Sequence, residues 1–296
     1  MTRTNAPRQL AVSLLLAVVG LASPAAAAAP APYALPWQLR PAGASTVLRL
    51  ENSLAFSDVG TTNVTFLLGS YAFNQNFAAI ARVGTVGHWP EVGESGAGIV
   101  NGAVGGMYAR KIGDLRAAAY LLFAVPFGMG GGNTPDPATA AAVRAGPLAR
   151  LAMDNAMFAV NDFTVFPGID LAWVRGGFTV QAEATVLQLT RVRGEQAQVD
   201  ESKTNFTSGL FAGWFVIPEV SLGAELRYQR WLSTPAAVQA DPASRDNLSA
   251  AFGVRAHLKL SKTIVARPGL SYTRGVGGKV GDLGYDVVQL DLPVQF

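Results

Sequence analysis

Few side chains of this 296-residue sequence could take part in acid–base, nucleophilic or metal chemistry. The chain has two histidines, His88 and His257, and no cysteine, so it can form no disulfide, thiolate nucleophile or cysteine-ligated metal site. Two isolated histidines also lack the spacing of a metal site. Neither histidine is accompanied by the Gly-x-Ser-x-Gly elbow of a serine hydrolase. We therefore predict no catalytic residue, no metal and no cofactor.

Many of the charged residues occupy every second position of otherwise apolar stretches. In segment 248–260, Arg255, His257 and Lys259 alternate with apolar residues. Strict alternation places one set of side chains on each face of a strand, whereas a helix would scatter the charges around its circumference. Segments 177–186 and 219–229 repeat the pattern. The side chains that could carry function are therefore presented by strands.

The same alternation along the whole chain predicts twelve strands. Pro167 and Pro268 lie inside two of them, and each removes a donor from the strand ladder and predicts a bulge or a break. Short connections alternate with longer ones, which is typical of the periplasmic turns and extracellular loops of an outer-membrane barrel. The predicted strands are 46–57, 63–73, 76–88, 97–111, 114–127, 161–174, 177–189, 205–217, 219–231, 247–260, 263–274 and 285–296.

The composition agrees with strands that face lipid. Half of the residues are apolar and 15% are charged, against about 25% charged residues in soluble domains. A spanning helix needs about 20 consecutive apolar residues, and beyond the N-terminus the longest run, 117–130, is shorter and contains Pro126. A sheet can cross a membrane only when it closes on itself. We predict an all-β fold, a closed antiparallel transmembrane β-barrel of about twelve strands. The alternative is a secreted β-sandwich, whose strands usually have about 5–6 residues and are therefore shorter than those predicted here.

Residues 1–29 have the order of a cleaved secretory signal peptide. Arg3 and Arg8 precede an apolar core at 10–21, and small residues follow at 23–29. We expect residues 30–44 to form an extended leader rich in proline and alanine, and residues 45–296 to form the barrel. Without residues 1–29 the chain has 21 basic and 20 acidic residues, which argues against nucleic acid as a partner.

The C-terminus carries a recognisable motif. Apolar residues alternate up to a terminal aromatic residue, and the members of this pattern are Val288, Leu290, Leu292, Val294 and Phe296. The motif resembles the C-terminal targeting signal of Gram-negative outer-membrane β-barrel proteins, which implies that the last strand is bound by the barrel-assembly machinery. It also implies an outer-membrane location, in contact with the lipid bilayer and with lipopolysaccharide. Within that class the chain resembles porin-like transporters of unknown substrate, such as those associated with aromatic-compound degradation.

The inner face of such a barrel is the candidate functional surface. We expect a narrow polar lumen that passes small solutes, and the alternative is an interior filled by paired charges. A structural or adhesive barrel that acts through its loops is the second functional hypothesis, and a lipid-hydrolysing barrel enzyme that uses His257 is the third. The predicted lumen-lining residues are Arg82, Arg116, Glu183, Glu225, Arg227, Arg255 and His257.

The connection 128–160 is the longest and is predicted to be partly helical. Asp136 is suited to cap a helix over 138–145, which we expect to be interrupted at Gly146 and Pro147 and resumed through 148–153. The connection could form a gate inside the lumen or a compact external cap. If it folds inward, the gating residues would be Arg144, Arg150 and Asp154.

Overall fold

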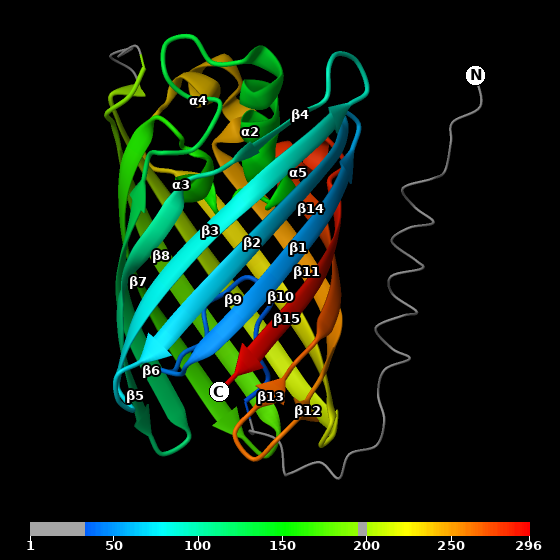
Figure 1. The fold of residues 1–296 in the computed structure, drawn as a ribbon. Helices are drawn as coiled ribbons and strands as arrows, with labels where there is room; N and C mark the ends of the chain where they lie inside the picture. Colours follow the sequence, from blue (N-terminus) through cyan, green and yellow to red (C-terminus); the bar gives the residue numbers. More distant parts are fainter. Residues whose placement is uncertain (1–32, 195–199) are drawn as a thin grey trace, which may run out of the picture.

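The computed structural model describes residues 33–194 and 200–296, which form one closed β-barrel (Figure 1). Within these residues twelve long strands each pair antiparallel with the next, and β1 pairs with β15 to close the ring. The predicted fold class is confirmed. The ring contains β1 (Val47–Ser57), β2 (Gly60–Ala72), β3 (Phe77–Pro90), β5 (Gly102–Ile112), β6 (Leu115–Val125), β7 (Asp162–Arg175), β8 (Phe178–Arg191), β9 (Ser202–Ile217), β10 (Val220–Trp231), β11 (Asp246–Ala256), β14 (Gly269–Gly278) and β15 (Asp286–Gln295).

The alternation of the sequence separates an outer from an inner face. On β11, the Phe252 side chain is 60% exposed on the outside, whereas Arg255 on the inside is 1% exposed. Other strands repeat this arrangement, with Leu226 of β10 and Val180 of β8 outside and Glu225 of β10 inside. A closed sheet with an apolar outer surface and a polar interior is the architecture of a membrane-spanning barrel.

Three short strands extend the ring where the sequence interrupts it. The predicted strand 97–111 is divided into β4 (Gly96–Ile99) and β5, and β4 pairs with β3. The predicted break at Pro268 is confirmed, because β13 (Val265–Ala266), which pairs with β12 (Leu258–Lys259), ends before it and β14 begins after it. At Pro167 the strand β7 continues, and only its pairing with β8 is interrupted locally.

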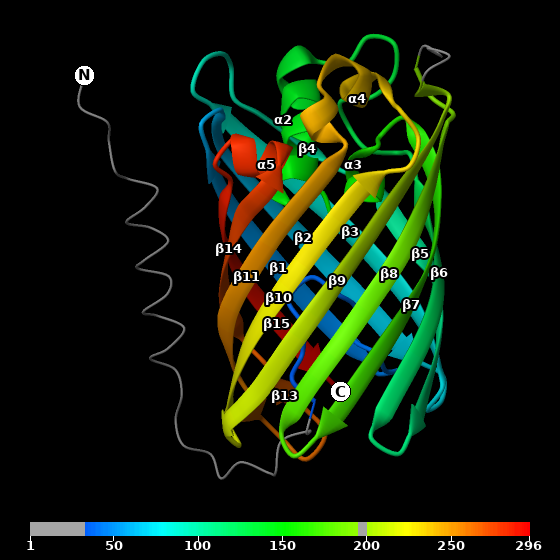
Figure 2. The same cartoon turned by 180° about the vertical axis from the view of Figure 1, so that it is seen from behind.

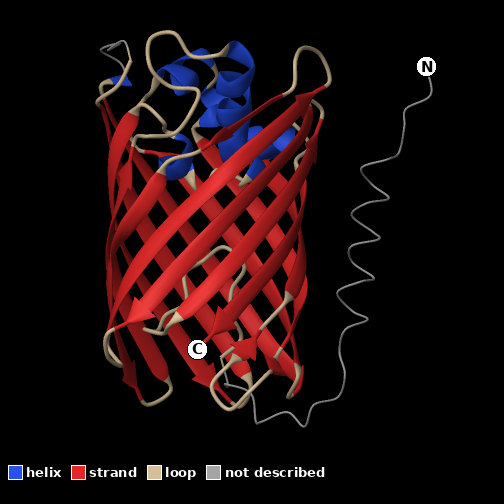
Figure 3. Cartoon of the chain, viewed as in Figure 1, coloured by secondary structure: helices blue, strands red, loops and turns tan. Residues whose placement is uncertain are grey.

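The two ends of the barrel differ (Figure 3). One, here called the turn end, carries the short connections and the C-terminus, and the other, the loop end, carries the helices. No helix in the described part of the chain is long and apolar enough to cross a membrane. The helices are α2 (Pro137–Ala149), α3 (Asn155–Phe158), α4 (Ala236–Ala240), the 3-10 helix η2 (Pro242–Ser244) and α5 (Lys279–Asp282).

The long connection 128–160 contains α2 and α3. Asp136 caps α2 as expected, because its carboxylate accepts the Thr139 N–H at 2.8 Å, and this hydrogen bond lowers the pKa of Asp136. The predicted interruption at Gly146 and Pro147 is wrong, since α2 continues through Pro147. The helix ends instead where Leu151 and Ala152 adopt positive φ values of 55° and 62°, which turn the chain into the barrel.

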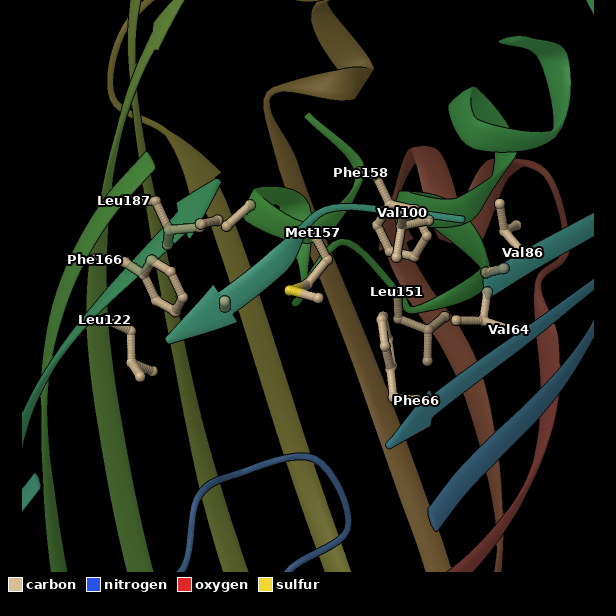
Figure 4. Packing of buried hydrophobic residues seen from close by; sticks show 14 of the residues in the cluster. Val64, Phe66, Val86, Val100, Leu122, Leu151, Met157, Phe158, Phe166 and Leu187 are labelled. Carbon is tan, nitrogen blue, oxygen red and sulfur yellow. The ribbon is translucent and has the colours of Figure 1, made fainter. Parts of the chain in front are cut away.

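Two segments occupy the interior. Residues 33–44, here called the N-terminal segment, run through the lumen on the turn-end side, where Figures 1 and 2 show them in blue inside the ring. This position differs from our expectation of a leader ahead of the barrel. Residues 150–160, here called the inward loop, fill the lumen below α2 (Figure 4). The predicted signal peptide, residues 1–29, lies outside the described residues.

Candidate functional site in the barrel lumen

All seven residues predicted to line the lumen lie on its inner face. Each belongs to the inward-facing set of its strand, and Glu225, Arg227 and Arg255 are each 1% exposed. Their part in transport stays a prediction. The set consists of Arg82 on β3, Arg116 on β6, Glu183 on β8, Glu225 and Arg227 on β10, Arg255 on β11 and His257 directly after β11.

Ion pairs connect the charged residues on one side of the lumen. Arg227 Nε lies 2.6 Å from Glu225 Oε1, and Arg49 Nε lies 2.7 Å from Asp291 Oδ1. The same Asp291 also pairs with Arg255. Removing one partner from such a buried pair leaves an uncompensated charge, at a cost of about 3–5 kcal/mol. On this side the interior is thus filled by paired charges, which was the alternative to an open lumen.

The N-terminal segment is held by two of the predicted lumen carboxylates. Glu225 accepts the backbone N–H of Trp37 at 2.7 Å, and Glu183 accepts that of Arg40 at 2.6 Å. The Arg40 guanidinium also donates to Glu183 at 2.9 Å. The segment contains neither helix nor strand, so wall side chains satisfy backbone donors that would otherwise be buried without partners.

A row of glycines provides the space that this segment occupies. Gly213, Gly223 and Gly253 lie opposite one another on β9, β10 and β11. A Cβ atom at Gly253 would lie 2.6 Å from the Trp37 ring, and one at Gly213 would lie 2.6 Å from Ala34. Sequence reasoning missed these residues. The available signal was the run of glycines at inward positions of neighbouring strands, where a filled wall would carry larger side chains.

The inward loop is attached to the wall by arginine–carboxylate pairs. Arg150 donates to Glu51 and to Asp154, each at 2.8 Å, and Asp154 also pairs with Arg82 of β3. The Arg82 guanidinium lies over the Phe66 ring, 3.9 Å from its centroid. Arg150 and Asp154 therefore face the lumen, as expected for an inward fold.

The third predicted gating residue lies elsewhere. Arg144 is exposed on the outer side of α2, so the structure does not bring it to the lumen. The reason is helical periodicity: Ala142, Val143 and Gly146 of α2 are buried, and the intervening position faces away from them.

Apolar packing fixes the inward loop in addition to its ion pairs. Leu151, Met157 and Phe158 are buried in one cluster with wall residues of β2 to β8 (Figure 4). The rings of Phe158 and Phe66 meet edge to face with centroids 5.9 Å apart. Asn101, between β4 and β5, donates to the carbonyls of Ala156 and Ala159 at 3.2 and 2.9 Å. Asn101 is fully buried, and the sequence analysis did not single it out.

A cavity of about 270 Å³ lies between the two segments. Its walls include Leu39 and Arg40 of the N-terminal segment and Met157 of the inward loop. They also include strand residues of the turn end, such as Gln295. The lumen of this structure is therefore a cavity bounded by both segments.

His257 has a partner that the sequence did not indicate. Its Nε2 atom lies 2.8 Å from Ser221 Oγ, while its Nδ1 atom has no hydrogen-bond partner within the described residues. The described residues also contain no group of three or more His, Cys, Asp or Glu side chains that could hold a metal ion. Ser221 and His257 thus form a buried hydroxyl–imidazole pair that lacks an orienting carboxylate.

The predicted assembly motif lies on the closing strand. Val288, Leu290, Leu292, Val294 and Phe296 belong to the outward-facing set, while the alternate residues of β15 are directed into the lumen. The strand pairs with β1 on one side and with β14 on the other. Recognition by the assembly machinery stays a prediction.

No protein-family model matches this sequence, and no curated protein matches it. Solved structures match its fold. The COG4313 outer membrane channel from Pseudomonas putida F1 has a TM-score of 0.56 and 12% identity, covering 88% of this chain and 98% of its own. The NanC porin has a TM-score of 0.53 and 10% identity, covering 84% of this chain and 98% of its own. The chain therefore has the fold of outer-membrane channel barrels.

Proposed function

We propose that this protein is an outer-membrane porin-like channel for small solutes, in which the N-terminal segment is a removable closure. The observation that carries the proposal is an irregular segment, held by wall carboxylates inside a membrane-type barrel whose inner face is charged. Solutes would cross by passive movement along this face once the segment has left. The fold shared with the NanC porin and the COG4313 channel is consistent with it.

The contacts of the N-terminal segment support its removal as a unit. None of its residues belongs to a strand, so its departure breaks no ladder of the barrel. Glu225 would retain Arg227 as its partner, and water entering from the turn end would solvate Glu183. The inward loop would still narrow the lumen, so we expect small solutes only.

Planar-bilayer recordings test this function. We expect the full chain to be mostly closed and a variant lacking residues 33–44 to conduct steadily, because the deletion vacates the part of the lumen that this segment fills. Liposome swelling should show uptake of small neutral and charged solutes by the same variant. Heat-modifiable migration on gels establishes that both proteins are folded.

A length-matched variant separates the side chains from the chain itself. Replacing residues 33–44 by twelve glycine and serine residues removes Trp37, Leu39 and Arg40 while keeping the tether to β1. We expect it to conduct as the deletion does, because the sequence-specific packing is lost. If every folded variant is silent in bilayers and in swelling, the channel function is wrong and a structural or adhesive barrel acting through its loops takes its place.

Hydrolysis by Ser221 and His257 is not part of this proposal. Nucleophilic activation by histidine normally uses a third group that orients the ring, and within the described residues Nδ1 of His257 has no such partner. Incubation of the full chain with phospholipid vesicles should release no fatty acid, and Ser221→Ala should change nothing. Hydrolysis that the Ser221→Ala variant abolishes would establish the enzyme instead.

We also propose that the C-terminal motif engages the barrel-assembly machinery, and that the outer surface contacts lipopolysaccharide in the outer leaflet. The apolar alternation up to Phe296 on an outward-facing edge supports the first contact. Deleting Phe296 should lower the amount of folded barrel in outer membranes, while refolding of the purified variant into detergent stays efficient. Equal membrane amounts would remove this assignment.

A further inference from the structure

The lumen cavity differs in character along its wall. One side is apolar and includes Leu68, Ile80, Met107, Leu122 and Phe166 from strands β2, β3, β5, β6 and β7. The remaining lining carries all five arginines of the cavity, together with apolar residues such as Leu39 of the N-terminal segment and Met157 of the inward loop. A ligand that fits both parts needs an apolar body and a polar head.

The charges of the cavity favour an anion. Its lining contains five arginines and two carboxylates, Glu51 and Asp154. Three of the arginines, Arg40, Arg49 and Arg82, have a carboxylate partner within ion-pair distance. Positive charge is therefore in excess among the described residues that line the cavity.

The excess resides on two arginines at the turn end. Arg267 is 6% exposed and donates to the neutral Gln295 side chain at 2.8 Å, and its Nε has no hydrogen-bond partner. Arg116 lies over the Tyr33 ring, 4.6 Å from the ring centroid, and its Nε also lacks a partner. Within the described residues neither arginine has a carboxylate within ion-pair distance.

The topology places these two cations on opposite walls. Arg116 lies at the start of β6, and Arg267 lies between β13 and β14, separated from β14 by Pro268; β6 and β14 are six positions apart in the ring of twelve. Both positions are at the turn end, so the two guanidinium groups flank that part of the cavity. Arg267 is buried and Arg116 is half-buried; withdrawing a cation from water without a charged partner is costly, and an anion placed there would supply the missing charge.

We infer that the cavity binds a small amphipathic carboxylate. Its head group would accept hydrogen bonds from Arg116 and Arg267, and its apolar body would lie against Leu68, Met107 and Phe166. This inference deepens the proposed channel function, since it names the solute class that the closed lumen holds. Mere cavity filling by any apolar molecule predicts no dependence on charge, which separates it from the inference.

Calorimetric titration of the full chain in lipid nanodiscs tests the site with hexanoate as the probe. We expect hexanoate to bind. Hexanamide and hexylammonium have the same apolar body without the negative charge, and we expect them to bind at least about tenfold more weakly. A hydrogen bond to a charged group is worth roughly 1.5–3 kcal/mol, and 1.4 kcal/mol corresponds to a tenfold difference in affinity. Arg116→Gln and Arg267→Gln should each weaken hexanoate binding by a similar factor and leave hexanamide unchanged. The control, Arg175→Gln, removes an exposed arginine from the turn end outside the cavity and should change neither.

Three outcomes would overturn the inference: absence of hexanoate binding, binding of hexanamide as tight as that of hexanoate, or hexanoate binding that both arginine variants retain in full. Arg116 is only partly buried, so its variant keeps the test available if Arg267→Gln fails to fold. The conductance of the variant lacking residues 33–44 is measured separately. Conductance without hexanoate binding refutes this site and retains the channel, whereas arginine-dependent binding to a barrel that never conducts refutes the channel and retains the site.

Discussion

The two segments inside the barrel differ in how much apolar packing holds them. The inward loop packs Leu151, Met157 and Phe158 into the largest buried apolar cluster that the described residues contain. The N-terminal segment instead depends on carboxylates that accept its backbone amides and on a small cluster around Trp37 and Leu39. Burial of a large side chain in a close-packed core contributes to the stability of the whole barrel. The inward loop is thus part of the core, while the N-terminal segment occupies a recess in the wall, here called the socket.

Because of this difference we assign separate roles to the inward loop and the N-terminal segment, although both obstruct the lumen. The inward loop is continuous with β7 and packs against the wall, and in our proposal it narrows the lumen permanently. Within the described residues, the covalent connection of the N-terminal segment to the barrel runs through the start of β1, and its other contacts with the wall are non-covalent. Its departure would open the lumen without unfolding the wall, so the decisive measurements compare stability with conductance.

The largest expected effect is on stability, from Phe158→Ala. The ring is 4% exposed and contacts Phe66, and loss of a buried phenylalanine costs about 3–5 kcal/mol. Urea unfolding in lipid vesicles, followed by tryptophan fluorescence, measures the change in the free energy of unfolding. Leu39→Ala is the matched variant in the N-terminal segment, and it should raise conductance while leaving the unfolding midpoint in place. Equal destabilisation by the two variants would show that the N-terminal segment stabilises the barrel as much as the inward loop does, and our distinction between core and socket would be wrong.

A smaller loss of stability is expected from Asn101→Ala. This change leaves the carbonyls of Ala156 and Ala159 without their buried donor, which costs about 1–3 kcal/mol. The released loop should also make bilayer currents fluctuate, a signature that removal of the N-terminal segment does not predict. Asn76→Ala changes a half-buried asparagine in the connection between β2 and β3, away from the inward loop, and serves as the control. Unaltered stability and quiet currents in Asn101→Ala would show that apolar packing alone holds the loop.

Conductance without a large loss of stability is the expectation for Gly209→Val. A Cβ at Gly209 would lie 2.4 Å from Leu39 Cδ2, so the added side chain displaces the N-terminal segment from its socket. We expect a severalfold rise in open probability in planar bilayers. Gly106→Val adds the same side chain to an outward position and should leave the channel closed. A closed Gly209→Val variant would show that the segment has room to rearrange inside the lumen.

The contrast also explains what could be predicted from the sequence. Alternation and proline are local signals, so alternation placed Glu225, Arg227 and Arg255 on the inner face and Pro268 located a break. The seating of residues 33–44 is decided by contacts between residues far apart in the chain, such as Trp37 with Glu225. A short segment rich in proline and alanine carries no periodicity that would indicate such a partner.

The same limit applies to the inward loop and to the buried polar contacts. Arg150 and Asp154 were singled out by charge, but their partner Glu51 belongs to β1, about a hundred positions away. Ser221 escaped notice beside His257 because their contact arises from the pairing of β10 with β11. The prediction for Arg144 failed in the opposite way. It assumed that a charged residue of the predicted gate points into the lumen, but the position of Arg144 on α2 directs its side chain outward.

The smallest expected effect concerns a contact that belongs to neither segment. At the loop end, Lys279 donates to Asp241, and this hydrogen bond, with one from the Ala243 N–H, lowers the pKa of Asp241. A carboxyl whose pKa is lowered by folding stabilises the folded loops above its ordinary pKa, and that stabilisation is lost as the pH falls through the lowered value. The protection of residues 236–245 against amide hydrogen exchange, taken relative to the intrinsic exchange rate at each pH, should therefore fall below about pH 4, and Asp241→Asn should show the low protection at every pH. The channel of the Asp241→Asn variant should stay closed throughout this pH range. If the channel instead opened with the same pH dependence as the amide exchange, the loop-end surface would be coupled to the closure of the lumen. The separate roles of the inward loop and the N-terminal segment, on which the other three experiments depend, would then be wrong.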